Sequence, residues 1–155
     1  MNKIQIITAI SIITFLFFSC RKESFISSPD ARLSLSADSI KFDTVFTTVG
    51  SITQSFKIFN DNDQKLLLSK VKLMGGAGSA YKININGLAV IEADNIELAA
   101  NDSIYIFVTV NVNPSAANLP FIISDSILIN YNGNNRFVQL QSYGQNAHFL
   151  NNTII

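Results

Sequence analysis

Residues 104–112 read Ile-Tyr-Ile-Phe-Val-Thr-Val-Asn-Val, the longest alternating run of apolar residues in the chain. Successive side chains of a β-strand point to opposite faces of a sheet, so every second residue here can enter a core. Shorter runs with the same period of two begin near Leu33, Ile52, Leu67, Tyr81, Ile127 and Val138. No segment keeps the spacing of an amphipathic helix over eleven residues or more. The sequence therefore predicts an all-β domain.

Two of the shorter runs lead to specific expectations about burial. The run over 52–58 is expected to bury Ile52, Phe56 and Ile58. The run over 67–73 is expected to bury Leu67, Val71 and Leu73, although Ser69 falls on the same phase and weakens that assignment.

Polar turn segments separate the runs, at 60–63, 75–79, 101–102, 113–114 and 132–135. The last of these contains Asn132-Gly133 between two alternating runs, which is a strong signal for a β-hairpin. Alternation implies one buried and one exposed face in each strand, which is typical of antiparallel sheets. We therefore predict an antiparallel β-sandwich of seven to nine strands.

The composition sets limits on the class of protein. The chain has 155 residues, 48% hydrophobic and 14% charged, with eleven basic and eleven acidic side chains and a formal net charge of zero. This composition is too apolar for a disordered chain, and the charge balance lacks the basic surplus of a nucleic-acid-binding protein. A single cysteine excludes an intrachain disulfide and a cysteine-rich metal cluster. The body of the chain is long enough for one domain with a sizeable core.

The N-terminus is expected to be a targeting signal. Lys3 is followed by residues 4–18, which carry no charge and are mostly apolar. This run is shorter than the roughly 20 residues of a transmembrane helix, so residues 1–19 are interpreted as a signal-peptide helix. The alternative is an amphipathic or buried helix of the domain itself.

The end of this segment resembles the lipobox of bacterial lipoproteins. Ser19 supplies the small residue before Cys20, whereas Phe17 departs from the usual leucine. The resemblance implies a diacylglycerol on the Cys20 sulfur and attachment to a membrane, in the manner of Bacteroidota-type outer-membrane lipoproteins. Residues 20–30 would then form the lipidated N-terminus and a tether. The alternative is a free cysteine behind an ordinary signal peptide.

A second resemblance covers most of the body. The opening Leu35-Ser-Ala-Asp-Ser-Ile-Lys-Phe42, the pair Val49-Gly50 and the stretch Phe56-Lys-Ile-Phe-Asn60 resemble Ig-like modules of the abnormal-spindle/Hydin and major-sperm-protein type. The stretch is also similar to the N-terminal module of Bacteroidota lipoproteins that continue into a parallel β-helix. The resemblance implies an Ig-like sandwich over residues 31–147. Residues 148–155 would be a C-terminal tail or the start of a further domain.

The sequence gives little evidence for catalytic residues. His148 is the only histidine and Cys20 the only cysteine, so neither a Cys–His pair nor a multi-histidine metal site is predicted. A Ser–His–Asp triad is formally possible, but no Gly-x-Ser-x-Gly elbow is present. Glu92, Asp94 and Glu97 are close enough in sequence to suggest paired carboxylates, but we interpret them as a solvated loop. We predict no enzyme activity, no catalytic or metal-binding residues and no cofactor.

Two turn segments resemble ligand-binding loops only superficially. Asp61-Asn62-Asp63 lacks the glycine and glutamate that a calcium loop places further along, so it is interpreted as a turn. Residues 75–79, Gly-Gly-Ala-Gly-Ser, lack the Gly-Lys-Ser/Thr ending of a phosphate loop and are interpreted as a flexible connection.

Four short motifs read Asp, then a hydroxyl residue, then an aliphatic residue. They resemble the O-glycosylation acceptor of Bacteroidota, which implies modification at Ser39, Thr44, Ser103 and Ser126. The alternative is that Asp-Ser and Asp-Thr precede strands because these residues favour turns.

Tyr105 and Phe107 lie out of phase with the buried side of the run 104–112. They are therefore candidates for an interaction face, which would dock a following domain or a glycan, unless a loop of this domain covers them. Together these features predict a non-catalytic, lipid-anchored cell-envelope module that serves as a structural spacer or an interaction domain. Its partners would be the membrane, through Cys20, and a downstream β-helix domain or another envelope protein. The alternative function is a ligand-binding, specifically glycan-binding, surface lipoprotein.

Overall fold

A computed structural model describes residues 24–46, 51–112 and 121–145. The predicted signal peptide, Cys20 and His148 lie outside the described residues. The described chain forms ten strands, together with a short 3₁₀ helix at Gly76–Gly78. The strands are β1 (Leu33–Leu35), β2 (Ser39–Phe46), β3 (Gln54–Asn60), β4 (Leu66–Leu73), β5 (Tyr81–Ile85), β6 (Leu88–Ala89), β7 (Glu92–Leu98), β8 (Ser103–Val110), β9 (Phe121–Tyr131) and β10 (Asn134–Gln145).

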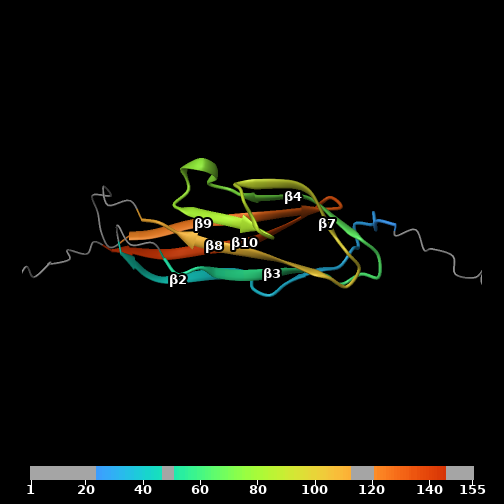
Figure 1. The fold of residues 1–155 in the computed structure, drawn as a ribbon, viewed down its shortest axis with the longest axis horizontal. Helices are drawn as coiled ribbons and strands as arrows, with labels where there is room; N and C mark the ends of the chain where they lie inside the picture. Colours follow the sequence, from blue (N-terminus) through green and yellow to red (C-terminus); the bar gives the residue numbers. More distant parts are fainter. Residues whose placement is uncertain (1–23, 47–50, 113–120, 146–155) are drawn as a thin grey trace, which may run out of the picture.

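The strands form two five-stranded sheets that pack face to face in an elongated sandwich (Figure 1). One sheet has the order β1-β3-β8-β5-β6 and the other the order β2-β10-β9-β4-β7. All pairs of neighbouring strands are antiparallel except β2 and β10, which are parallel. The predicted all-β sandwich is confirmed. The structure has more strands than expected because β6 is only two residues long and β7 was interpreted as a loop.

The core lies between the two sheets and is built by the alternation that the sequence predicts. In β8, which is the central strand of its sheet, Ile104, Ile106, Val108 and Val110 are buried. The hairpin predicted at Asn132-Gly133 connects β9 to β10, and both turn residues have positive φ. A two-residue turn of this kind matches the right-handed twist of the strands it joins.

Strand β4 corrects one expectation about burial. Leu66 and Leu68 are buried, as are Val71 and Leu73, whereas Leu67 is only partly buried. The pairing of β4 with β9 shifts register between Leu68 and Lys70, so the buried side changes phase at Ser69. A β-bulge inserts one extra residue in this way. The prediction for Leu67 was therefore wrong, and the polar Ser69 marked the place of the shift.

Strand β3 corrects another expectation. Phe56 and Ile58 are buried as predicted, but Ile52 is 76% exposed. Ile52 precedes the first residue of the strand, Gln54, so the alternation of the sheet does not govern its side chain.

The acidic segment 92–98 is strand β7, which contradicts its interpretation as a loop. It pairs antiparallel with β4, and the register places Asp94 opposite Lys70 and Glu92 opposite Lys72. Opposite charges on facing positions stabilise a pair of strands, and charged side chains protect a sheet edge from further pairing. The carboxylates that suggested a solvated loop therefore belong to an edge strand, where Asp94 and Glu92 face lysines of β4.

The glycine-rich segment 75–79 is held against β9. Its backbone N–H at Gly75 donates to Asp125 Oδ1 at 2.9 Å, and the hydroxyl of Ser79 donates to the other oxygen of the same carboxylate. A Cβ at Gly75 would meet the carboxylate of Asp125, so a larger residue would displace the side chain that anchors this segment. The segment is anchored by a carboxylate and does not simply bridge two strands.

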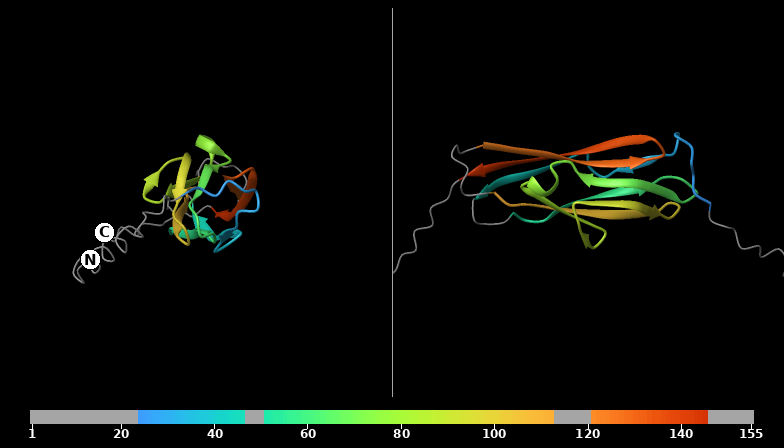
Figure 2. Two further views of the ribbon diagram at one scale, coloured as in Figure 1. Left: turned by 90° about the vertical axis from the view of Figure 1, so that its right-hand side faces the viewer. Right: turned by 90° about the horizontal axis from the view of Figure 1, so that it is seen from above.

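The two ends of the described chain lie at opposite ends of the sandwich (Figure 2). Residues 24–30, which belong to the predicted tether, are attached to the end that carries the β9–β10 turn. The amide of Asn132 donates to the carbonyls of Ile26 and Ser28 at 2.9 and 3.0 Å, and that of Asn134 donates to Pro29 at 2.7 Å. Strand β10 then runs the length of the molecule to the other end. Within the described residues, no helix has the length and apolar character needed to cross a membrane.

Candidate interaction face

Tyr105 and Phe107 project from the outer side of β8, in the middle of its sheet. Their exposed fractions are 43% and 38%, so no described segment of the domain covers them. Lys57 of β3 lies opposite Tyr105, and Asn84 of β5 lies opposite Phe107. The rings therefore lie on a solvent-facing surface with polar neighbours on both sides.

The rings on this surface are already arranged in a cluster. Tyr105 and Phe107 stack with a centroid separation of 5.6 Å and an interplanar angle of 16°. The Nζ atom of Lys57 lies 4.5 Å from the Tyr105 centroid and 5.9 Å from the Phe59 centroid. Such contacts add to stability beyond area burial, and they fix the positions of the rings before any partner arrives. We call Lys57, Phe59, Tyr105 and Phe107 the aromatic face.

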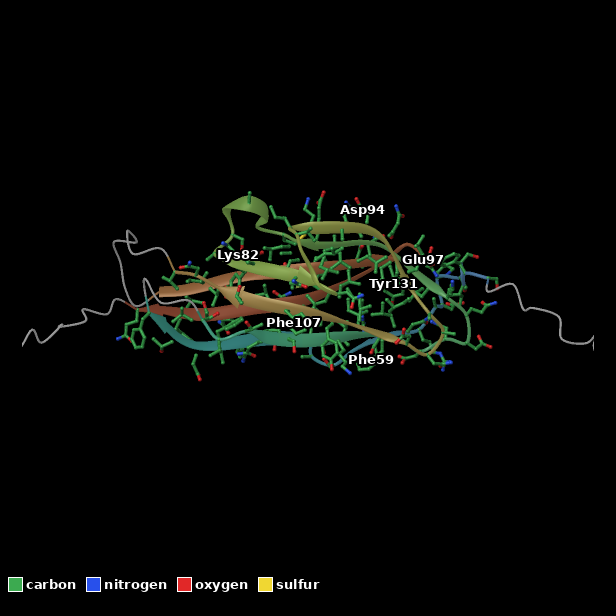
Figure 3. The ribbon with its side chains drawn as sticks, viewed as in Figure 1. Phe59, Lys82, Asp94, Glu97, Phe107 and Tyr131 are labelled. Atoms are coloured by element: carbon green, nitrogen blue, oxygen red, sulfur yellow. The ribbon has the colours of Figure 1, made fainter. Side chains whose placement is uncertain are left out.

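A groove with a volume of about 490 Å³ borders the aromatic face at Phe107. Its lining consists of Thr53, Lys82, Ile83, Asn84, Gly87, Ala89, Phe107 and Thr109. Figure 3 shows Phe107 and Lys82, which come from the neighbouring strands β8 and β5. The side-chain oxygen of Asn84 accepts a hydrogen bond from the Gly87 N–H at 2.7 Å, which fixes the orientation of the amide. We call this the β5 groove.

The surface around the groove has a positive character. Strands β3, β5 and β8 contribute two lysines, Lys57 and Lys82, and their sequences contain no aspartate or glutamate. The described residues that line the β5 groove likewise include no acidic side chain. These lysines would attract a negatively charged ligand, and no carboxylate among the described lining residues would repel it.

The outer side of β4 and β7, in the other sheet, is different. Its three carboxylates are each within ion-pair distance of a lysine: Lys70–Asp94 at 2.6 Å, Lys72–Glu92 at 3.2 Å and Lys65–Glu97 at 3.7 Å. The hydrogen bond to Asp94 raises the pKa of Lys70 above its usual value. These exposed pairs neutralise one another's charge, and exposed ion pairs of this kind contribute little to stability.

The four candidate O-glycosylation residues do not form one site. Ser39 and Thr44 are exposed on β2, whereas Ser103 of β8 and Ser126 of β9 are partly buried. The N–H groups of Ser103 and Ser126 each donate to the carboxylate of the preceding aspartate at 2.7 Å. At these two positions the Asp-Ser pair has a local structural function.

The exposure of Tyr105 and Phe107 was predicted from the sequence, whereas Lys57, Lys82 and Asn84 were not predicted to lie beside them. These three residues lie on the polar phase of their strands, where most side chains merely face solvent. Only the pairing of β3, β8 and β5 shows that they surround the two rings. Among the described residues, no group of three or more His, Cys, Asp or Glu side chains is placed to hold a metal ion.

No family model and no curated protein matches the chain. It is similar in structure to a family 123 glycoside hydrolase from Clostridium perfringens, with a TM-score of 0.51, 10% identity and coverage of 75% of this chain. The chain spans 27% of that hydrolase. It is also similar to the ASH/PapD-like domain 7 of human CEP192, with a TM-score of 0.49, 12% identity and coverage of 85% of this chain and 96% of that one.

A third similar structure is WR4, a member of the MSP family from C. elegans, with a TM-score of 0.44, 11% identity and coverage of 74% of this chain and 98% of that one. At such identities the likeness concerns the fold alone. The fold is the β-sandwich that the sequence analysis predicted, with two five-stranded sheets whose neighbouring strands are nearly all antiparallel.

Proposed function

We propose that the chain is a non-catalytic cell-envelope module, held to a membrane by lipid on Cys20, which binds a partner through its aromatic face. The observation that carries this proposal is the stacked, solvent-exposed pair Tyr105 and Phe107 on the central strand of a sheet. Clustered apolar groups on a soluble surface mark contact sites, and aromatic side chains often supply much of the binding energy there.

The arrangement of the chain ends supports an additional role as a spacer. Residues 24–30 are fastened at one end of the sandwich, and β10 leads away from it. The 12 residues of β10 span about 40 Å at roughly 3.4 Å per residue. A domain that follows β10, such as a β-helix, would therefore be held at least this far from the attached N-terminal segment. Another envelope protein could occupy the same position.

The lipid anchor fits the end at which the chain enters the domain. Four residue steps separate Cys20 from Ser24, which is a reach of at most about 14 Å. Acyl chains contribute about 0.8 kcal/mol for each buried methylene, so two or three of them would hold the module firmly. The end with the β9–β10 turn would then face the outer membrane of a Gram-negative cell. Exposure of Ser39 and Thr44 on the edge strand β2 is compatible with O-glycosylation there.

A photo-cross-linking residue at position 107 tests the proposal in the cell that naturally produces the chain. Position 137 is the matched control, because Phe137 is also a phenylalanine, 46% exposed, but lies on the other sheet. We expect an adduct of defined mass from position 107 and none from position 137. Equal yields from the two positions would contradict the proposal.

A second candidate function is that of a glycan-binding surface lipoprotein. The β5 groove favours this candidate, because an open groove beside an exposed ring suits a small ligand better than a broad protein surface. Both candidates use the same face of the molecule, and they differ in the chemistry of the partner.

A further inference from the structure

We infer that the β5 groove binds an acidic saccharide, meaning a sugar chain that carries carboxylate groups. This inference rests on the proposed function, in which the aromatic face is a contact surface, and it specifies the partner. It depends on three properties of the groove: an aromatic wall, a positive charge without opposing carboxylates, and hydrogen-bonding side chains around the opening.

Phe107 supplies the aromatic wall. Phe107 lines the groove, and its ring is nearly parallel to that of Tyr105, at an angle of 16°. Lys57 lies over Tyr105 and fixes the pair from the side of β3. The negative face of an aromatic ring attracts the weakly positive C–H groups of a ligand, and the C–H face of a sugar ring has the matching flat shape.

The charge of the groove selects among sugars. Lys82 lines the groove and is exposed, and Lys57 adds a second positive charge on the same face. No acidic side chain lines the described groove, and none occurs within β3, β5 or β8. Hydrogen bonds between a lysine and a carboxylate are about twice as strong as those between neutral groups. A neutral sugar hydroxyl can also accept a charge-assisted hydrogen bond from lysine, but a carboxylated sugar adds the attraction between opposite charges.

The remaining polar groups suit sugar hydroxyls. Thr53 and Thr109 line the groove with hydroxyls that can donate or accept. Because the oxygen of Asn84 already accepts from Gly87, its amide nitrogen is the atom that would donate to a ligand. The volume of about 490 Å³ falls within the range of about 300–1,000 Å³ that is usual for small-ligand sites.

An acidic peptide is the main competing ligand of the same charge. Peptides are usually bound by adding a strand to a sheet edge or by placing apolar anchors in a groove. The β5 groove adjoins β5, of which only Asn84 and Ile85 pair with β6, but its lining also presents a ring, hydroxyls and an amide. These groups favour the saccharide, and the acidic peptide becomes an outcome of the test.

The test is calorimetric titration of the full chain in detergent with hexagalacturonate. Two matched ligands accompany it: a neutral galactose hexamer, which lacks the carboxylates, and hexaglutamate, which keeps the charge without the sugar. We expect hexagalacturonate to bind at least about tenfold more tightly than either, a ratio that corresponds to about 1.4 kcal/mol.

Four variants locate the binding. Phe107→Thr and Lys82→Gln should each weaken hexagalacturonate binding about tenfold, which corresponds to one aromatic or one charge-assisted contact. The controls are Phe137→Thr and Lys41→Gln, which make the same changes at exposed positions of the other sheet and should leave the affinity unchanged. Lys82 is exposed, so the Lys82→Gln variant reports on binding even if Phe107→Thr folds poorly.

The inference is overturned if hexagalacturonate does not bind, if hexaglutamate or the neutral hexamer binds as tightly, or if the control variants lose as much affinity as the groove variants. This failure is distinguishable from failure of the proposed function. If cross-linking from position 107 persists while the saccharide does not bind, the contact face stands and the acidic saccharide is excluded as its partner.

Discussion

Replacing Asn60 by aspartate should destabilise the domain strongly, although it changes only one side-chain group. Asn60 is 1% exposed at the end of β3. Its amide nitrogen donates to the carbonyls of Gln64 at 2.9 Å, Ala99 at 2.8 Å and Leu98 at 3.3 Å. Its amide oxygen accepts from the side chain of Asn62 at 2.7 Å. The residue therefore connects β3 to the end of β7 inside the sandwich.

The magnitude follows from these contacts. An aspartate keeps the acceptor that Asn62 uses, but it cannot donate, so the carbonyls of Gln64 and Ala99 lose their short hydrogen bonds. Each buried polar group left unsatisfied costs about 1–3 kcal/mol, and an unpaired buried charge typically costs about 3–5 kcal/mol. We expect the free energy of unfolding to fall by about 4 kcal/mol, a large part of a total of roughly 5–15 kcal/mol.

Urea unfolding, followed by circular dichroism, measures this loss at several pH values. Burial raises the pKa of an aspartate above its unfolded value of about 3.9, so the loss should be smallest below pH 4 and should grow as the pH rises through the folded pKa. Asn84→Asp is the matched control. Asn84 uses its oxygen to accept from Gly87, which a carboxylate can also do, so this variant should lose less than about 1 kcal/mol.

Two results would refute this reasoning about Asn60. One is a loss at neutral pH no larger than that of Asn84→Asp, and the other is a loss that does not depend on pH. Either would mean that the amide nitrogen of Asn60 does not hold the two sheets together.

Three further predictions concern the anchor, the core and the alkaline limit of stability. Cys20→Ala should move the chain from the detergent phase to the aqueous phase, because no acyl chain can attach; equal partition of variant and wild type would exclude the lipid. Ile106→Asp should prevent folding, because Ile106 is fully buried, whereas Thr109→Asp on the other side of β8 should be mild. The reverse order in a urea melt would show that the register of β8 is wrong. The hydroxyl of Tyr81 donates to the Ile123 carbonyl at 2.9 Å, and burial raises the pKa of this hydroxyl. The contribution of Tyr81 to the free energy of unfolding should therefore be complete below about pH 10 and be lost as the pH rises further. Tyr81→Phe should cost about 1 kcal/mol at pH 7 and make the alkaline loss shallower, and an unchanged alkaline slope in pH-dependent melts would contradict this assignment.

Much of the fold could be predicted because most strands bury one side. The alternation over 104–112 identified β8 and its buried residues, and Asn132-Gly133 identified the hairpin between β9 and β10. The predictions from alternation were wrong for two segments, β4 and residues 92–98, where a second effect determines the structure. A bulge at Ser69 changes the buried phase of β4. The polar segment 92–98 is a strand because it pairs with β4, whose lysines face its carboxylates.

The candidate site could be predicted only in part. Phase alone placed Tyr105 and Phe107 outside the core, because their neighbours in sequence alternate so regularly. Lys57, Lys82 and Asn84 come from strands that are distant in sequence, and only the strand order β3-β8-β5 brings them to the same face. Single-strand patterns contain no information on which strands become neighbours.

The proposed role of the aromatic face is to bind a partner. The most direct measurement places a photo-cross-linking residue at position 84, in the β5 groove, and compares its adduct in the native host with and without the double change Tyr105→Thr and Phe107→Thr. Circular dichroism confirms that both proteins are folded. We expect a defined adduct that disappears in the double variant. An adduct of equal yield in both proteins would contradict it.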